Sequence, residues 1–252
     1  MLLPALGKAK AKAQGISCLN NLRQMGLAWV LYVGDNQDRI PPNAANDSCS
    51  RTTEWVRGWL RFASDHPDNT NTVFLTESSL GPHLANLDVW RCPSDPSTTR
   101  GGNSRGLLRK RVRSASMNAF MDGSTLQYPN EPWVVFRKAT DIPAPTQMWV
   151  LLDERLDSIN NGFFVPPVKG VFTQDTAKYA WSDVPGSYHN GACGLNFADG
   201  HSEIHPWRDT RTKPPVKPGV EIARNFDNAT PSPGNQDAYW LGIRSTVLKN
   251  QP

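Results

Sequence analysis

The chain has 252 residues, and its 27 basic and 23 acidic side chains leave a formal net charge of +4. A chain of this length can bury a substantial core without metal ions or disulfides. Nine tryptophans and nine phenylalanines exclude a disordered protein, and the small net charge does not by itself indicate a polyanionic partner. No stretch approaches the roughly 20 consecutive apolar residues that span a bilayer.

The N-terminal segment predicts one long helix over residues 5–34. It has no proline between Pro4 and Pro41 and is rich in Ala, Leu, Lys, Gln and Arg, which favour helix. Four apolar side chains recur at helical spacing and share one face of this helix. These residues are Leu19, Leu22, Trp29 and Val33.

After the helix, short apolar or aromatic runs alternate with Asn, Asp, Gly, Ser and Pro. The continuous apolar run Met148–Leu152 predicts a central buried strand. Asp199 and Gly200 separate two extended runs and predict a hairpin whose two turn residues both have positive φ. The strand candidates are Val73–Leu75, Val89–Arg91, Trp133–Phe136, Met148–Leu152, Gly162–Val165, Gly194–Ala198 and Ser202–His205.

This order of elements predicts an α+β fold, in which the long helix packs on an antiparallel β-sheet with irregular loops. We expect residues 1–36 to form the helical spine and residues 37–252 a β-rich head. The C-terminal part is rich in proline from Thr210 onward, which predicts an extended surface excursion. The apolar segment Trp240–Ile243 is expected to dock back onto the head.

Four cysteines form an even set without a CxxC pair, which disfavours a zinc ribbon or a thioredoxin-like motif. In an oxidising compartment they could form up to two disulfides, and as small apolar side chains they could equally be buried as free thiols. The cysteines are Cys18, Cys49, Cys92 and Cys193.

Much of the positive charge lies between Arg100 and Arg113. We expect a solvated loop or exposed edge there, and the alternative is a patch that binds nucleic acid or another anionic polymer. No recognition motif accompanies the charges, so nucleic acid stays a minor alternative. The candidate side chains are Arg105, Arg109, Lys110, Arg111 and Arg113.

Residues able to bind a metal occur in two parts of the chain, around Asp153–Asn160 and around His189–His201. Zinc would suit the histidines, and calcium would suit the carboxylate and amide oxygens, although the spacing matches no EF-hand. Structural roles compete with both, because Asp199 can cap its own turn. The candidates are Asp153, Asp157, Asn160, His189, Asp199 and His201.

Ordered motifs along the chain resemble the type IV pilin-like family whose members carry an H-x9-DG signature. His189 and the pair Asp199-Gly200 have that spacing. Three further segments add to the likeness: the helix segment around Ser17–Gln24, the CPSD element Cys92–Asp95, and the DE…DSIN segment that starts at Asp153-Glu154. The resemblance touches most of the chain from residue 2 to about residue 207.

The resemblance implies a non-catalytic subunit of a type IV pilus-like or type II secretion pseudopilus filament, outside the cytoplasmic membrane. Its partners would be itself and other pilin-like subunits, which meet the helix. The apolar helix face and the free face with Lys8, Lys12 and Arg23 are both assigned to assembly. The signature residues His189, Asp199, Gly200, Asp153 and Glu154 are expected to be structural.

Family members begin with a basic leader and an apolar, membrane-inserting stretch that this sequence does not show. We expect either a truncated body or a divergent member that does not insert into the membrane.

Two alternatives to a filament subunit follow from the residues. One is a minor pilin-like protein that binds DNA or a surface polymer through Arg100–Arg113, and the other is a metal-dependent hydrolase around His189, Asp199 and His201. The absence of a G-x-S-x-G, H-E-x-x-H or Walker motif argues against an enzyme.

Overall fold

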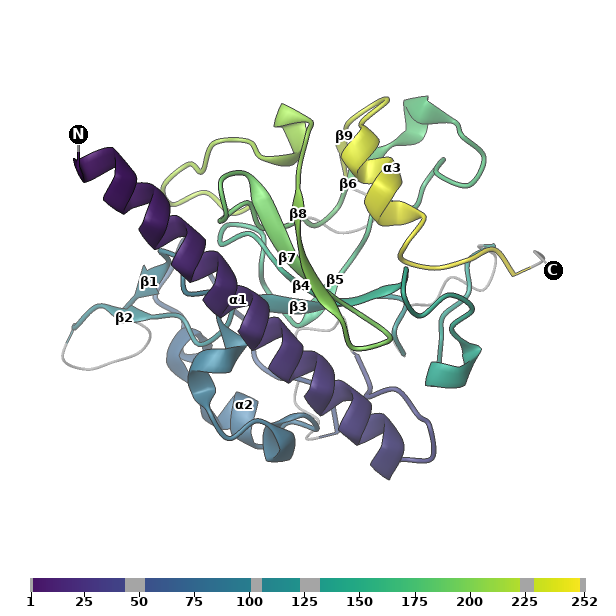
Figure 1. The fold of residues 1–252 in the computed structure, drawn as a ribbon, viewed down its shortest axis with the longest axis horizontal. Helices are drawn as coiled ribbons and strands as arrows, with labels where there is room; N and C mark the ends of the chain where they lie inside the picture. Colours follow the sequence, from purple (N-terminus) through teal and green to yellow (C-terminus); the bar gives the residue numbers. More distant parts are fainter. Residues whose placement is uncertain (1, 44–52, 101–105, 123–131, 223–228, 250–252) are drawn as a thin grey trace.

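A computed structural model describes residues 2–43, 53–100, 106–122, 132–222 and 229–249. The long N-terminal helix is confirmed: α1 covers Leu2–Asp35 and lies diagonally across the strands of the main sheet (Figure 1). Among the described residues, none of the helices combines the length and apolar content needed to cross a lipid bilayer.

The main sheet has five strands in the order β5-β3-β4-β7-β8. The strands are β3 (Ala115–Asn118), β4 (Trp149–Asp153), β5 (Phe163–Phe164), β7 (Ala192–Phe197) and β8 (Ser202–Pro206). The expected antiparallel pairing holds for β3 with β4, β4 with β7, and β7 with β8. The edge strand β5 instead pairs with β3 in parallel. The fold is therefore α+β with a mixed sheet.

Three of the expected strands are not strands. Val73–Leu75 lies in the short helix α2 (Val73–Thr76), and most of Val89–Arg91 belongs to the 3-10 turn Leu87–Trp90. The segment Trp133–Phe136 forms only isolated bridges, from Trp133 to Leu248 and from Phe136 to Met121. Short apolar runs also suit buried single-turn helices, and periodicity cannot distinguish the two over three or four residues.

The remaining elements are short. Two further two-stranded sheets pair β1 (Thr98–Thr99) with β2 (Arg109–Lys110) and β6 (Ala180–Trp181) with β9 (Thr230–Pro231). The last helix, α3, covers Gln236–Gly242 and begins at Asn235, whose side chain accepts hydrogen bonds from two backbone N–H groups. Single 3-10 turns occur at Pro67–Thr70, Gly81–His83, Leu87–Trp90, Ala139–Asp141, Thr176–Lys178 and Thr210–Thr212.

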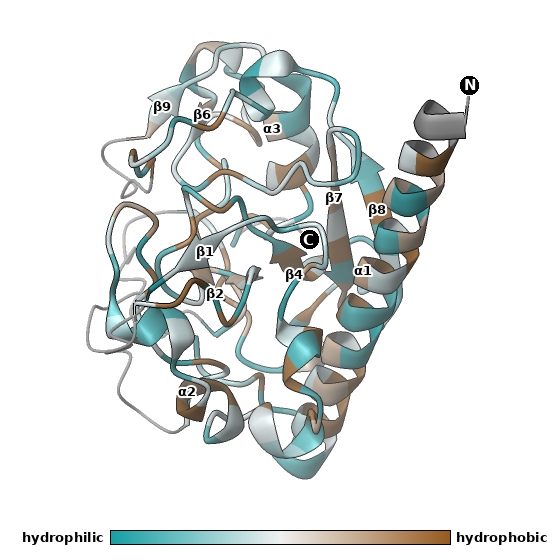
Figure 2. Cartoon of the chain, turned by 90° about the vertical axis from the view of Figure 1, so that its left-hand side faces the viewer, coloured by the Kyte–Doolittle hydropathy of each residue, from teal (hydrophilic) through white to brown (hydrophobic). Residues whose placement is uncertain are grey.

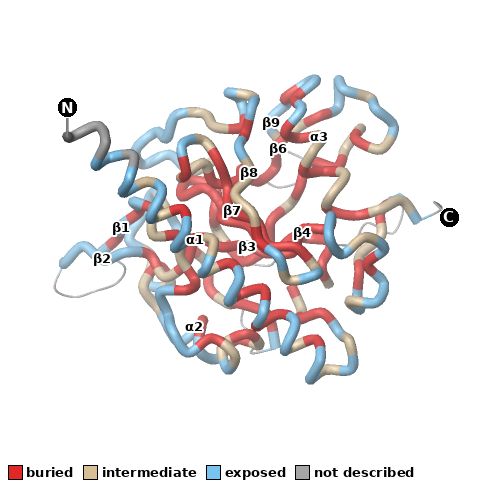
Figure 3. The backbone as a smooth tube through the Cα atoms, viewed as in Figure 1, coloured by how far each residue is buried: buried red, intermediate tan, exposed pale blue. Residues whose placement is uncertain are grey.

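Strand β7 is buried on both faces because different elements cover them. Side chains alternate along a strand, so Gly194 and Asn196 face α1, whereas Cys193, Leu195 and Phe197 belong to a second cluster. That second cluster includes Leu241 of α3, which confirms that the C-terminal segment docks onto the head. The buried centre of the sheet and the exposed outer side of α1 are seen in Figure 3, and the side view in Figure 2 shows α1 beside β7 and β8.

The hairpin between β7 and β8 is confirmed, but its turn differs from the predicted one. Only Gly200 has positive φ (91°), while Asp199 does not. The Gly200 N–H donates to the Phe197 carbonyl at 2.9 Å, and the Phe197 N–H donates to His201 at 2.9 Å. This is the longer loop in which glycine occupies the left-handed position after a turn, and it is common in hairpins.

We predict that Gly26→Ala destabilises the protein by about 1–3 kcal/mol, because a Cβ there would lie 2.1 Å from the Asn196 side chain. Asn196 cannot easily move, since its amide donates to Gly200, His201 and Ser202. Urea unfolding would measure the change. Gly34→Ala is the matched control: it lies in the same helix with nothing within 4 Å, so it should stabilise by up to about 1 kcal/mol. Equal effects of both substitutions would contradict this account.

Candidate metal centre

Four side chains from four separate parts of the chain meet beneath α1. They are Cys18 on α1, Cys92 after the 3-10 turn Leu87–Trp90, Asp153 at the end of β4 and His189 before β7. One potential ligand atom from each lies within 4.8 Å of all the others, and all four residues are buried. Among the described residues, this is the one group of three or more Cys, His, Asp or Glu side chains that comes together in this way.

The Asp153 carboxylate lies at the centre of the hydrogen bonds in this group. Its Oδ2 accepts from the Cys18 thiol at 2.7 Å, and its Oδ1 accepts from the Ser114 hydroxyl at 2.8 Å. The Ser114 oxygen in turn accepts from the Cys92 backbone N–H at 2.7 Å. The orientation of the carboxylate is therefore fixed by Cys18 on α1 and by Ser114, the residue directly before β3. Ser114 also connects the carboxylate to the backbone of Cys92.

His189 contributes the nitrogen of the group. Its Nε2 lies 3.3 Å from the Cys92 sulfur. Its Nδ1 is buried without a hydrogen-bond partner and faces Gly15, where a Cβ would stand 3.7 Å from it. The lack of a side chain on Gly15 thus lets α1 pass close to the imidazole ring.

Burial sets the protonation of these groups. It raises the pKa of Asp153 to about 6, although hydrogen bonds from Cys18 and Ser114 oppose the shift. The hydrogen bond with Cys92, burial and the nearby Asp153 charge raise the pKa of the Cys18 thiol far above its usual range. Burial also lowers the pKa of His189, so its imidazole is neutral. Without a cation, the group therefore holds thiols and a neutral imidazole.

Further polar contacts attach α1 to the Cys92 loop on either side of this group. The Gln14 side chain donates to the Pro93 carbonyl at 3.3 Å. The Asn21 side chain donates to the Arg91 carbonyl at 2.9 Å and to the Asp88 carbonyl at 3.1 Å. The helix between Gln14 and Asn21 is thus in direct contact with the segment Asp88–Pro93, although the paired residues are 67 to 79 positions apart in the sequence.

The structure brings together only two of the predicted metal ligands, Asp153 and His189. Asp199 and His201 do not join the group within the described ranges: they pair with each other on the exposed hairpin turn, 2.5 Å apart. The three residues His189, Asp199 and His201, considered from the sequence as an alternative hydrolase centre, therefore do not form one group among the described residues. Asp199 also accepts from the His201 backbone N–H, which is the turn-capping role considered from the sequence.

The DE…DSIN segment has structural contacts beyond Asp153. The buried Glu154 carboxylate accepts from the hydroxyls of Ser116 at 2.6 Å and Ser158 at 2.7 Å, and burial raises its pKa to about 7. The Asp157 carboxylate is paired with the Arg155 guanidinium at 2.5 Å and 3.0 Å, so it is not free to bind calcium.

Asn160 is also used within the protein. Its side-chain oxygen accepts from the Asn161 backbone N–H at 2.6 Å, and its backbone carbonyl accepts from Leu60 at 2.5 Å. The predicted calcium site therefore does not assemble around Asp157 and Asn160.

The three described cysteines are buried free thiols, which is the second of the two alternatives considered from the sequence, and none of them forms a disulfide with another. Cys18 and Cys92 belong to the group above. The Cys193 thiol donates to the Asp153 backbone carbonyl at 3.1 Å, and its side chain lies in the second core cluster. Cys49 lies outside the described residues. Sequence spacing could not have paired Cys18 with Cys92 in one site, because 73 residues separate them and no local motif links the two.

The described residues of the basic stretch, Arg100 and 106–113, do not form a continuous cationic patch. Arg111 and Arg113 are fully buried, and their guanidinium groups donate to the backbone carbonyls of Leu156 and Ala115, among other acceptors. Arg109 and Lys110 are exposed on β2, and Arg105 lies outside the described residues. The assignment of Arg111 and Arg113 to polymer binding is therefore wrong. Both side chains are buried in the head and donate hydrogen bonds to its backbone carbonyls.

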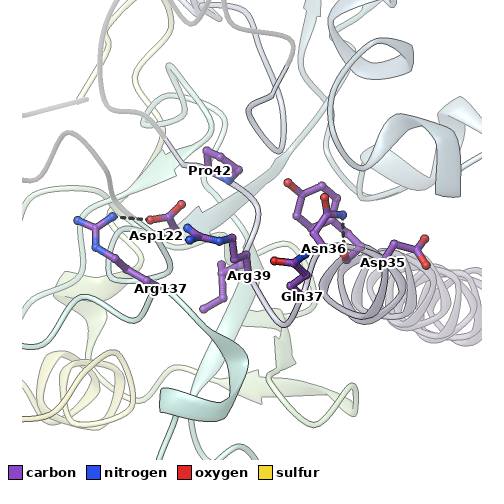
Figure 4. Close-up of a pocket in the computed structure, with 9 residues that line it drawn as sticks. Asp35, Asn36, Gln37, Arg39, Pro42, Asp122 and Arg137 are labelled. Carbon is purple, nitrogen blue, oxygen red and sulfur yellow. Dashed lines mark hydrogen bonds and ion pairs between the residues drawn. The ribbon is translucent and has the colours of Figure 1, made fainter.

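A separate pocket of about 370 Å³ lies at the C-terminal end of α1 (Figure 4). Arg39 and Arg137 lie near the Asp122 carboxylate, and Arg137 pairs with it at 2.8 Å. The other labelled residues, Asp35, Asn36, Gln37 and Pro42, come from the end of α1 and the segment after it. The described lining contains neither cysteine nor histidine, so its chemistry differs from that of the buried group.

Comparison with protein-family models, with curated proteins and with solved structures gave no match.

The fifth histidine, His205, lies apart from the buried group and stacks on Trp240 with a ring separation of 3.6 Å. Burial lowers its pKa to about 4, opposed by Asp237 and reinforced by Arg244 and Arg208. Because the unfolded chain binds this proton more tightly, stability should fall as the pH drops from about 6.5 to about 4. We expect a loss of about 1–2 kcal/mol after allowing for solvent screening.

The variant His205→Phe keeps a ring over Trp240 and removes the titration. Urea unfolding of both proteins between pH 7 and pH 4 should show the wild type losing stability relative to the variant as the pH falls. The buried carboxylates contribute equally to the pH dependence of both proteins, so the difference between the two stability curves reports His205 alone. Parallel stability curves would show that His205 does not carry this pH dependence.

Proposed function

We propose that the chain is a non-catalytic structural subunit of a type IV pilin-like filament, of the pilus or type II secretion pseudopilus kind. One observation carries the proposal: α1 has large apolar side chains on the face turned away from its own sheet. A helix that served only the core of its subunit would have a polar outer face.

Of the two faces assigned to assembly from the sequence, the apolar one is not accessible, and the face proposed here is the free one, which carries Lys12 and Arg23. Leu22, Trp29 and Val33 are buried against the protein's own core, and Leu19 is half-buried, so they are not available to a partner. The exposed large apolar residues of α1 are Leu6 near its start and, further along, Ile16, Leu27, Val30 and Leu31. We call the last four the outer stripe.

Helical geometry places the residues of the outer stripe on one side of α1. At 100° per residue, Ile16, Leu27 and Leu31 fall within about 60° of one another, and Lys12 and Arg23 lie on the same side. Leu27 and Leu31 are 58% and 46% exposed. Residues four apart form the ridges that interdigitate when helices pack, so this stripe suits contact with the helix of another subunit. The exposed Lys12 and Arg23 would limit the contact to partners that offer acceptors or acidic groups there.

Under this proposal, α1 is the spine that packs against neighbouring subunits, and the head with its irregular loops forms the outer surface. The subunit works outside the cytoplasmic membrane, and its partners are copies of itself and other pilin-like subunits. The head needs no reacting groups for this role. Its buried carboxylates and arginines serve the internal packing of the loops.

We predict that the double substitution Leu27→Glu with Leu31→Glu weakens self-association of the chain by tenfold or more. Each leucine would bury apolar area worth about 1 kcal/mol or more at a helix–helix contact, and 1.4 kcal/mol corresponds to a factor of ten. Sedimentation velocity over a wide concentration range would measure it, with wild-type chain expected to associate at high concentration.

Val73→Glu is the control, because Val73 is equally exposed (46%) but lies on α2 rather than on the outer stripe. It should associate like the wild type. All three proteins should unfold within about 0.5 kcal/mol of one another, as is usual for surface substitutions. A wild-type chain that stays monomeric at every concentration, or a double variant that associates as well as the wild type, would argue against the outer stripe as an assembly face.

A further inference from the structure

We propose that Cys18, Cys92, Asp153 and His189 bind one zinc ion in a closed, structural site that fastens α1 to the head. This inference rests on the buried group alone and is independent of the filament proposal. It differs from both metal sites considered from the sequence, which contained no cysteine.

The donor set selects the metal. Two sulfurs, one imidazole nitrogen and one carboxylate oxygen match the ligands of four-coordinate zinc, whereas calcium and magnesium require oxygen ligands. Both cysteines and the histidine come from different elements, so the set is assembled by the tertiary fold and not by a local loop.

The distances suit a tetrahedral ion after small movements. Zinc bonds of about 2.0–2.3 Å place neighbouring ligand atoms roughly 3.3–3.8 Å apart. The Cys92 sulfur and His189 Nε2 are already 3.3 Å apart, the Cys18 sulfur and Asp153 Oδ2 are 2.7 Å apart, and no pair exceeds 4.8 Å. Entry of the ion requires the second pair to separate by less than about 1 Å, because the shared proton is replaced by the metal.

Charge and protons balance in the bound form. Both thiols lose their protons to solvent as two sulfur–zinc bonds form, Asp153 is ionised and His189 stays neutral. The ion therefore offsets two of three negative charges in a buried site, and such charges are costly without a cation. The Ser114 hydroxyl keeps its hydrogen bond to Asp153 Oδ1 and orients this ligand from outside the coordination sphere.

The site is structural because the protein supplies all four ligands and all four are buried. A catalytic zinc keeps one position open for water or substrate. The ion would join α1, the Cys92 loop, β4 and the turn before β7, so its effect is to hold the helix against the head.

A disulfide between Cys18 and Cys92 fits the surroundings less well. It would remove the thiol that donates to Asp153 Oδ2 and the sulfur that contacts His189 Nε2. Two buried polar groups would then lose partners, which costs free energy at each. Zinc satisfies both groups at once.

The test begins with the wild-type full chain, purified under reducing conditions without a metal-affinity tag and supplied with zinc, then freed of excess by gel filtration. Mass spectrometry of the metal content should give about one zinc per chain. Removing the ion with a chelator should lower the melting temperature by about 10 °C or more, and zinc should restore it. Cobalt in place of zinc should give the thiolate-to-metal charge-transfer absorption that reports sulfur ligands.

Three variants locate the site. Cys18→Ser and His189→Ala should each lower the zinc content at least tenfold under the same gel filtration and abolish or alter the cobalt absorption. His201→Ala is the matched control, since this exposed histidine lies outside the buried group, and it should retain the ion. Where a cysteine variant does not fold, the metal content and chelator response of the wild type decide the question.

Each contrary result overturns the proposal. Wild-type protein that carries no zinc and has free thiols after denaturation has no such site. A Cys18–Cys92 disulfide found by peptide mapping of protein prepared without reductant, together with no zinc in reduced protein, would assign the cysteines to a covalent link instead. Loss of zinc from His201→Ala but not from His189→Ala would place the ion on the exposed hairpin.

Discussion

The close approach of α1 to β7 is the constraint on which the rest of the structure depends. At Gly26 a Cβ would lie 2.1 Å from the Asn196 side chain, and at Gly194 it would lie 2.4 Å from Leu22. The helix backbone can therefore rest almost directly on the strand. Asn196 fills the space left by Gly26 and holds the β7–β8 hairpin through three hydrogen bonds from its amide. The position of the helix and the shape of the hairpin are consequently coupled.

The same approach creates the buried group and divides the surface of α1. Cys18 lies one turn before Leu22, so seating the helix on Gly194 brings its sulfur to Asp153 on the neighbouring strand. Gly15 passes over His189 for the same reason. Once the inner face is used in this way, the apolar residues Leu27 and Leu31 remain outside. A single packing contact thus produces both a candidate metal centre and a candidate assembly surface.

Buried polar side chains stabilise a head in which regular strands are few and short. Loops leave backbone N–H and C=O groups that must find partners when they are buried. Asn69 meets this need by bonding the backbone of Arg61 and Ser64, and Asn118 does so for the carbonyls of Trp149 and Ser245. The same role explains why Arg111 and Arg113 of the basic stretch lie inside the protein and not on its surface.

The sequence by itself determined the long helix, the α+β class, the central strand Met148–Leu152 and the β7–β8 hairpin, because these depend on local periodicity and turn chemistry. It also identified Asp153 and His189 as metal-capable residues. Only the tertiary structure decided that Cys18 and Cys92 join them and that Asp199 and His201 do not. It also decided that the apolar face of α1, one of the two faces assigned to assembly, is internal. Such outcomes depend on which segments, far apart in sequence, the packed core brings together, and a periodic pattern shows that a helix face is buried without showing what buries it.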